Sequence, residues 1–153
     1  MILTITPPEE TALQAHLHKL RTQLHEGPEL SWQEHRTTRL VRRELEALCL
    51  EPVPLGLPTG TAALLRGALP GPTVGLRADL DALPITERTG AEFSSRVPGV
   101  MHACGHDIHM AALLGAARLL AARREQLAGN VLFLFQPAEE AATGAMQVLE
   151  LSL

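Results

Sequence analysis

The sequence predicts an α/β fold in which helices pack on a mixed, mostly parallel β-sheet. Three observations predict it: leucines recur with a helical period near the N-terminus, short apolar runs are bounded by turn residues, and helical and strand segments alternate in the second half. The 153 residues, 46% of them apolar, suffice for one domain with a hydrophobic core.

Two helices are predicted before the first strand. Four leucines at steps of three and four residues form the apolar stripe of the first helix: Leu13, Leu17, Leu20 and Leu24. Gly27-Pro28 ends this helix, and Ser31 followed by Glu34 predicts a capping box that begins the next one. The second helix has an apolar inner face, formed by Leu40, Val41, Leu45 and Leu48. Its charged residues are expected to face water: Arg36, Arg39, Arg43 and Glu46.

Two strands are predicted next, at Thr61–Arg66 and Thr73–Ala78, because each is a short apolar run. Gly67 and Pro70-Gly71-Pro72 separate them and predict a turn. The segment Asp79–Met101 is expected to be irregular, and connections of this length inside a domain are usually functional.

A helix, a strand and a further helix complete the predicted order. The segment Asp107–Arg124 is rich in alanine and leucine on all sides, which predicts a well-buried helix. After a turn at Gly129-Asn130, the strongly apolar run Val131–Phe135 predicts a central strand. Pro137 ends this strand, and the last helix is expected to begin near Glu139.

The bulk properties argue against several classes of protein. A net charge of -4 without a basic stripe argues against nucleic-acid binding, and no apolar run is long enough to span a bilayer. Met1–Pro8 lacks the basic and apolar regions of a signal peptide, and Cys49 and Cys104 are too few for a disulfide framework. We therefore expect a cytoplasmic protein with reduced thiols.

Residues that can perform chemistry follow the predicted strands. Asp79 and Asp81 come after the second strand, the segment Met101–His109 precedes the third helix, and Glu139 and Glu140 come after the last strand. In α/β sheets, sites form where loops leave the carboxyl ends of strands. The three segments are therefore expected to converge.

The segment Met101–His109 has the composition of a metal site, since it holds three histidines, a cysteine and an aspartate. Cys104 and His106 flank Gly105, which lets the backbone bend so that both side chains can converge. Thiolate, imidazole and carboxylate are the ligands of zinc and similar metals.

The other members of this segment have alternative interpretations. Asp107 would alternatively cap the helix, and His109 would alternatively pack within it. For His102, a metal ligand, a substrate contact and a residue that only fills the loop remain open.

Two carboxylate pairs are compatible with the same chemistry. Glu139 and Glu140 at a strand-to-helix corner would point in different directions, so that one binds a metal and the other acts as general base. Alternatively, both favour the positive end of a helix dipole. Asp79 and Asp81 flank Leu80 and lie on the same side of an extended backbone. One could bind a metal or orient a ligand histidine, and otherwise both are solvated loop residues.

Four segments carry a resemblance to a known family: Leu24–Leu30, Gly75–Ile85, Gly99–Asp107 and Phe135–Glu140. In their order and spacing they resemble the aminoacylase, hippurate hydrolase and auxin-conjugate hydrolase branch of the di-metal peptidase-like amidohydrolases. The resemblance implies a three-layer α/β/α sandwich of the zinc-exopeptidase type, incomplete here. Residues 1–153 would form the N-terminal part of its catalytic domain.

The same resemblance implies an activity and its residues. The reaction would be hydrolysis of the amide bond of N-acyl amino acids or similar small conjugates, by metal-bound hydroxide. Two divalent ions are implied, with zinc expected and manganese, cobalt or nickel as alternatives. By position in the motifs, Cys104, His106 and Glu140 would be metal ligands, Glu139 the general base and Asp81 an aspartate that supports a ligand.

Full members of this family carry further parts, namely two more histidine ligands and a smaller dimerisation domain. No histidine follows Glu140, and Val148–Leu153 departs from the family pattern. We therefore expect an incomplete site and a homo-oligomer formed through an open sheet edge. The alternatives are a non-catalytic oligomerising fragment of such an enzyme and a structural zinc domain, against which the lack of a Cys-x-x-Cys pair counts.

Overall fold

The computed structural model describes residues 5–151, so expectations about Met1–Thr4 and about Ser152 and Leu153 lie outside the described residues. Along the chain the elements are α1 (Pro7–Glu26), α2 (His35–Ala47), β1 (Glu51–Val53), β2 (Thr61–Arg66), β3 (Leu69–Asp79), α3 (His106–Ala121), a 3-10 turn (Arg124–Gln126), β4 (Ala128–Gln136) and α4 (Gly144–Leu149). Asp79–Met101 is irregular after its first residue, as predicted.

The strands form one sheet in the order β1-β2-β4-β3. β4 lies between β2 and β3, which confirms the central position predicted from its apolar run. The sheet is mixed, as predicted, but it is not mostly parallel: only β3 and β4 pair in parallel, while β1 with β2 and β2 with β4 are antiparallel. The reason is that, among the described residues, only β3 and β4 are joined by a crossover helix, α3.

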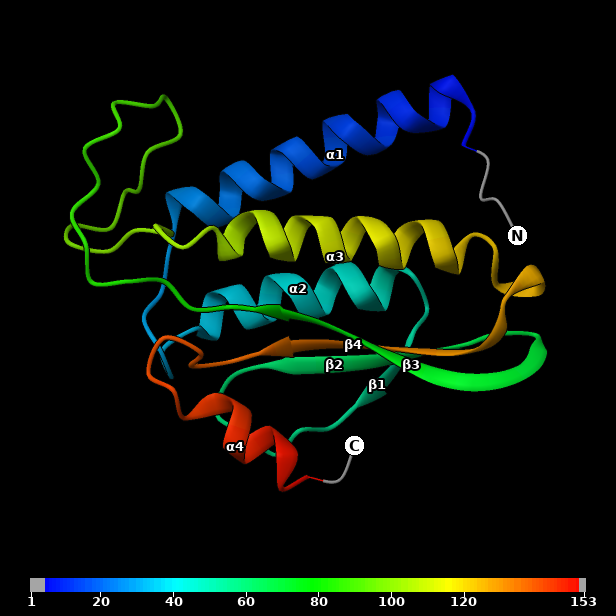
Figure 1. The fold of residues 1–153 in the computed structure, drawn as a ribbon. Helices are drawn as coiled ribbons and strands as arrows, with labels where there is room; N and C mark the ends of the chain where they lie inside the picture. The colour runs from blue at the N-terminus through cyan, green and yellow to red at the C-terminus, as the bar shows by residue number, and fades with distance from the viewer. Residues whose placement is uncertain (1–4, 152–153) are drawn as a thin grey trace.

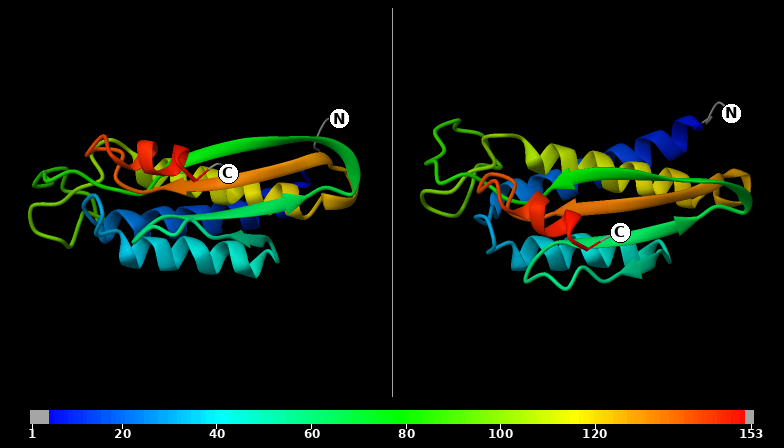
Figure 2. Two further views of the ribbon diagram at one scale, coloured as in Figure 1. Left: turned by 90° about the horizontal axis from the view of Figure 1, so that it is seen from below. Right: turned by 60° about the horizontal axis from the view of Figure 1, so that its bottom comes forward.

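Helices cover both faces of the sheet unequally. α1, α2 and α3 lie together on one face, and the short α4 lies on the other, so the order of layers is helix, sheet, helix (Figures 1 and 2). The core lies between the sheet and the three long helices, where Phe133 and Phe135 of β4 belong to one cluster with the buried apolar residues of these helices. No helix within residues 5–151 is both long and apolar enough to cross a membrane.

Both predicted turns lie inside strands. β3 begins at Leu69 and so includes Pro70-Gly71-Pro72, and β4 begins at Ala128 and so includes Gly129-Asn130. The pairing of these two strands shifts register between Leu69 and Thr73. Glycine permits this irregular pairing, because a Cβ on Gly71 would lie 2.6 Å from the backbone nitrogen of Gly129.

The predicted capping box at Ser31 and Glu34 is wrong. α2 begins at His35, and Glu34 makes no side-chain capping bond to it. A capping box is present instead at the start of α1, between Thr6 and Glu9. Ser31 and Glu34 make tertiary hydrogen bonds, described below.

The apolar and charged faces of the first two helices mostly agree with the prediction. In α1, Leu20 and Leu24 are buried, whereas Leu13 and Leu17 are half-buried. In α2 the predicted inner residues are buried, with Leu48 half-buried, and the predicted outer residues are all exposed: Arg36, Arg39, Arg43 and Glu46.

The last helix begins at Gly144 and not near Glu139. Ala138 and Ala142 have left-handed backbone conformations, with φ of 50° and 54°, which interrupt a helix. Residues 139–142 therefore form a turn, closed where the Gly144 N–H donates to the Ala138 carbonyl at 3.1 Å.

Candidate metal centre

β3 and β4 end, and α3 begins, at the same end of the sheet (Figure 1). The predicted metal-binding residues meet there. Cys104, His106 and Glu140 each offer one ligand atom, and these three atoms lie within 4.8 Å of one another. Cys104 lies just before α3, His106 is the first residue of α3, and Glu140 follows β4. The fold therefore brings a thiol, an imidazole and a carboxylate together from segments far apart in sequence.

His106 is oriented by the backbone of β3's exit loop. Its Nδ1 lies 2.8 Å from the carbonyl oxygen of Asp81, and a carbonyl only accepts, so Nδ1 carries the proton. In the neutral ring the unprotonated nitrogen is then Nε2, which lies 3.8 Å from Glu139 Oε2. A neutral histidine held in this tautomer is suited to bind a metal through Nε2.

The carboxylate of Asp81 holds the turn that carries both glutamates. Asp81 is fully buried, and it accepts from the Glu139 N–H at 3.1 Å and from the Glu140 N–H at 2.9 Å. The Ser31 hydroxyl donates to the same carboxylate at 2.7 Å. Asp81 thus supports His106 through its carbonyl and the glutamate turn through its side chain.

Glu34 binds the residue just before this pair. It is fully buried, and it accepts from the Ala138 N–H at 2.8 Å and from the Thr59 hydroxyl at 2.7 Å. Three successive backbone amides, at 138, 139 and 140, are therefore bound by two buried carboxylates. This role was not predicted from the sequence, although Glu34 precedes the buried Val41 and Leu45 at a helical spacing.

The donor set suits a divalent cation. Glu140 Oε1 is buried and has no hydrogen-bond partner among the described residues, so it is available to a ligand. Desolvation by neighbouring groups raises the pKa of the exposed Cys104 thiol, and the hydrogen bond to Glu140 and the charges of Glu140, Glu139 and Asp79 raise it further. A cation bound between these groups would offset the same negative charges.

Asp79 lies beside this cluster and is not a solvated loop residue. Its side chain is largely buried, and Arg77 donates to Oδ2 at 3.0 Å. Its Oδ1 is buried without a hydrogen-bond partner among the described residues. The helix-dipole interpretation of Glu139 and Glu140 also fails, because α4 begins only at Gly144.

The remaining residues of the histidine segment lie around the three donors. His102 is buried, and neither ring nitrogen has a hydrogen-bond partner among the described residues. Burial lowers the pKa of His102 to about 4, against the opposing attraction of Asp107. Asp107 is buried and does not cap α3, whose N-cap is Gly105. His109 is exposed, with its ring 5.9 Å from that of His106.

Comparison with known proteins agrees with this geometry. Residues 75–153 match the model of peptidase family M20/M25/M40. N-acetylcysteine deacetylase of Bacillus subtilis is 50% identical over 142 residues, which cover 92% of this chain and 37% of the relative. IAA-amino acid hydrolase ILR1-like 6 of Arabidopsis thaliana is 48% identical over 137 residues, which cover 89% and 29% respectively.

A solved structure agrees as well. A Bacillus subtilis protein described as a dinuclear metal-binding peptidase of the M20 family superposes with a TM-score of 0.90 and 49% identity, over 94% of this chain and 40% of that one. The chain therefore spans well under half the length of these relatives.

The fold and the cluster of donors define a class of α/β protein with a candidate metal centre. Within this class, the chain belongs to peptidase family M20/M25/M40.

Proposed function

We propose that residues 1–153 form the N-terminal part of the catalytic domain of a metal-dependent amidohydrolase, which hydrolyses the amide bond of N-acyl amino acids or similar small conjugates. The observation that carries the proposal is the convergence of Cys104, His106 and Glu140 within 4.8 Å. The substrate class is supported by relatives named for N-acetylcysteine, IAA–amino acids and N-acetyldiaminopimelate, all amino acid derivatives.

Each residue has a distinct part in this proposal. Cys104, His106 and Glu140 hold divalent metal, zinc by preference, as part of a site for two ions. Bound metal would polarise the scissile carbonyl and acidify water. Glu139, 38% exposed at the side chain, accepts a proton from that water and passes it to the leaving amine. Asp81 orients His106 and the glutamate turn.

We also propose a cytoplasmic location and a homo-oligomeric state. Both cysteines are free and exposed, which suits a reducing compartment. β3 lies at an edge of the sheet, and its exposed residues offer a surface for a second copy. Neither a nucleic acid nor a membrane is proposed as a partner.

The test combines metal binding with hydrolysis. Zinc binding is measured by equilibrium dialysis for the unaltered chain, for Cys104→Ser and for the matched control Cys49→Ser, an exposed cysteine far from the site in sequence. We expect Cys104→Ser alone to weaken binding, by more than about tenfold. Glu139→Gln should retain zinc. The absence of zinc binding in the unaltered chain contradicts the proposal.

Hydrolysis of N-acetyl amino acids distinguishes an enzyme from a fragment that only binds metal. Turnover that Glu139→Gln abolishes supports catalysis by the chain itself. Stoichiometric zinc without turnover supports the second candidate, a non-catalytic oligomerising fragment of such an enzyme. That candidate is favoured by one observation, namely that the chain spans 37% of its deacetylase relative.

A further inference from the structure

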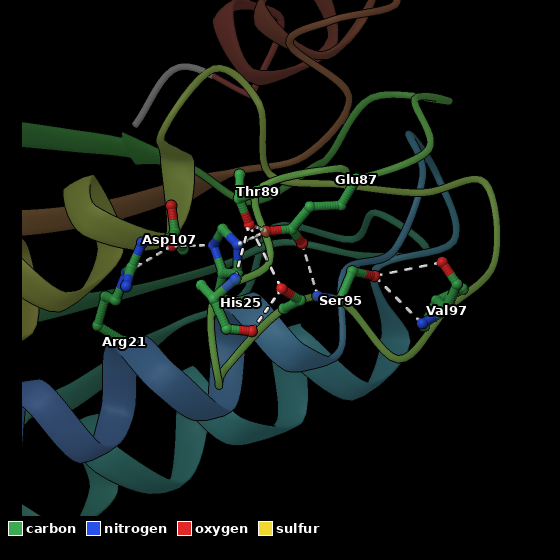
Figure 3. A network of polar contacts seen from close by, with 9 residues as sticks. Arg21, His25, Glu87, Thr89, Ser95, Val97 and Asp107 are labelled. Carbon is green, nitrogen blue, oxygen red and sulfur yellow. Dashed lines mark hydrogen bonds and ion pairs between the residues drawn. The ribbon is translucent and has the colours of Figure 1, made fainter.

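A second group of buried polar residues lies outside the metal donors and centres on His25, near the end of α1 (Figure 3). The His25 ring is 5% exposed at the side chain. Its Nδ1 lies 2.7 Å from Asp107 Oδ2, and its Nε2 lies 3.2 Å from Glu87 Oε1. One imidazole therefore joins two carboxylates that are 20 positions apart in the sequence.

One side of this group reaches the metal donors. Asp107 directly follows His106, and its side chain is 1% exposed. Besides His25, Arg21 donates to the same Asp107 oxygen through Nε at 2.9 Å. Two residues of α1 therefore fix the first turn of α3, which is the turn that carries His106.

The other side of this group holds the irregular segment 84–100. Glu87 accepts from the Ser95 N–H at 2.6 Å and from the Thr89 hydroxyl, so it joins the two halves of the segment. The Phe93 ring contacts His25 edge-on, at 5.4 Å between ring centroids. Arg21 lies over the same Phe93 ring at 4.2 Å.

The segment has few other bonds to the rest of the protein. Among the described residues, its backbone hydrogen bonds to other segments are those of Ile85 with Leu83 and of Arg96 with Glu26, and the Arg96 side chain also pairs with Glu26. A bridge between Leu83 and Met101 closes its base. A buried network of side-chain hydrogen bonds can hold a region that lacks regular secondary structure. Loss of one member leaves buried partners unsatisfied, which makes local opening easier.

We propose that His25 is a positioning residue that couples segment 84–100 to the metal-ligand turn, through its simultaneous hydrogen bonds to Glu87 and Asp107. A displacement of Glu87 is passed through the His25 ring to Asp107 and hence to His106. The order of the segment thereby sets the geometry of a metal ligand. The metal part of this inference rests on the proposed function, whereas the coupling itself does not.

The coupling is tested on the metal-free chain by amide hydrogen exchange. Glu87→Gln is compared with Glu92→Gln, which makes the same chemical change in the same segment, at an exposed carboxylate with no hydrogen bond or ion pair to the described residues. We expect Glu87→Gln to raise exchange about tenfold in segment 84–100 and also in residues 105–110, and Glu92→Gln to raise neither. Unchanged exchange of β2 and β4 serves as the folding control.

His25→Gln tests the central residue in the same way. It should raise exchange in both regions, whereas His18→Gln, at an exposed histidine of the same helix, should not. If Glu87→Gln and His25→Gln raise exchange in segment 84–100 but leave residues 105–110 unchanged, the coupling is overturned. Because Glu87 lies outside the helices, its variant keeps the proposal testable even where His25→Gln does not fold.

Binding of Co²⁺ distinguishes the positioning role from a purely structural role, which would leave the cobalt absorption and affinity unchanged. In the Co²⁺-loaded chain, Glu87→Gln should shift the thiolate-to-cobalt absorption and weaken cobalt binding, about tenfold by analogy with other supporting partners of metal ligands. Unchanged absorption and affinity count against the positioning role. If the unaltered chain binds no cobalt, the proposed metal site fails, and hydrogen exchange alone still decides the coupling.

Discussion

Glu34, the residue just before α2, accepts a hydrogen bond from the backbone N–H of Ala138 at 2.8 Å, across 104 positions of sequence. Asp81 accepts from the next two amides, those of Glu139 and Glu140. Two buried carboxylates thus fix a turn that contains a left-handed alanine and would otherwise leave its amides unpaired. The position of the two glutamates depends on acids that would not themselves touch a substrate.

Replacement of Glu34 by glutamine tests the first of these bonds. A glutamine offers one accepting oxygen and cannot serve both the Ala138 N–H and the Thr59 hydroxyl as the carboxylate does. We expect a loss of about 1–3 kcal/mol in the free energy of unfolding, measured by urea denaturation. Glu46→Gln, at an exposed position of α2, should change it by less than about 0.5 kcal/mol. Equal effects at both positions would contradict this role.

Replacement of Asp81 by asparagine tests the support of the metal donors. The variant loses at least one of the three bonds made by the carboxylate, so that the turn with Glu139 and Glu140 loosens. Zinc affinity should fall about 10- to 100-fold, measured by competition with a chelating dye. Ser31→Ala removes one of the same bonds and leaves the carboxylate in place, so its effect should be smaller. A zinc affinity that is the same in Asp81→Asn and in the unaltered chain would refute this role.

The lowered pKa of Glu87 predicts how the free energy of unfolding depends on pH. Burial acts to raise its pKa, but hydrogen bonds from Ser95, Thr89 and His25 outweigh it and lower the pKa to about 2. The folded pKa is below the ordinary value of 4.5, so the folded state binds this proton less readily than the unfolded state. The stabilisation from Glu87 is therefore complete above about pH 4.5 and is lost as the pH falls toward about 2.

The comparison with Glu87→Gln isolates this effect, because glutamine does not titrate. The free energy of unfolding of each protein is measured by urea denaturation at several values between about pH 7 and pH 3. The advantage of the unaltered chain over the variant should be greatest near neutral pH and should shrink as the pH falls below about 4.5. An advantage that stays constant over this range, or grows in acid, would show that the Glu87 pKa is not lowered.

The metal donors could be predicted from sequence because they lie in short local patterns. Cys104 and His106 flank one glycine, and Glu140 lies three residues after the proline that ends an apolar strand, so local sequence alone indicated them as candidates. The family resemblance then gave each an expected role. The structure adds their proximity, which no local pattern contains.

The supporting residues could not be predicted in the same way, because their partners are distant in sequence. His25 bonds to a residue 82 positions away, and Glu34 to one 104 positions away. Ser31 and Glu34 also have the spacing of a capping box, so a local rule gave a plausible but wrong role. Tertiary hydrogen bonds took precedence over capping at this position.

In the sheet, too, features with a local sequence pattern were predicted, and features that depend on distant residues were not. The apolar run Val131–Phe135 predicted the central strand, because a strand that is covered on both faces is apolar along its whole length. Residues 69–72 did not give such a signal, since they are exposed in an edge strand, and proline and glycine there indicated a turn. The strand direction depends on the crossover through α3, which the apolar pattern does not specify.

The exposed edge strand leads to a prediction about self-association. β3 has 11 residues, lies at the edge of the sheet, and exposes Val74 by 53% and Leu69 by 50%. An edge strand of this length has unpaired backbone groups and an apolar surface that a second copy of the chain can cover. We expect an oligomer in solution, with a molar mass by light scattering that rises with protein concentration.

Val74→Lys should shift this equilibrium toward the monomer, because a lysine on an edge strand disfavours strand pairing through charge repulsion and desolvation. Ile85→Lys makes the same change at an apolar residue that is 43% exposed but lies outside the strands, so it should leave the molar mass unchanged. If both variants dissociate equally, general surface charge and not the β3 edge controls association. A monomeric unaltered chain at high concentration would rule out self-association through this edge.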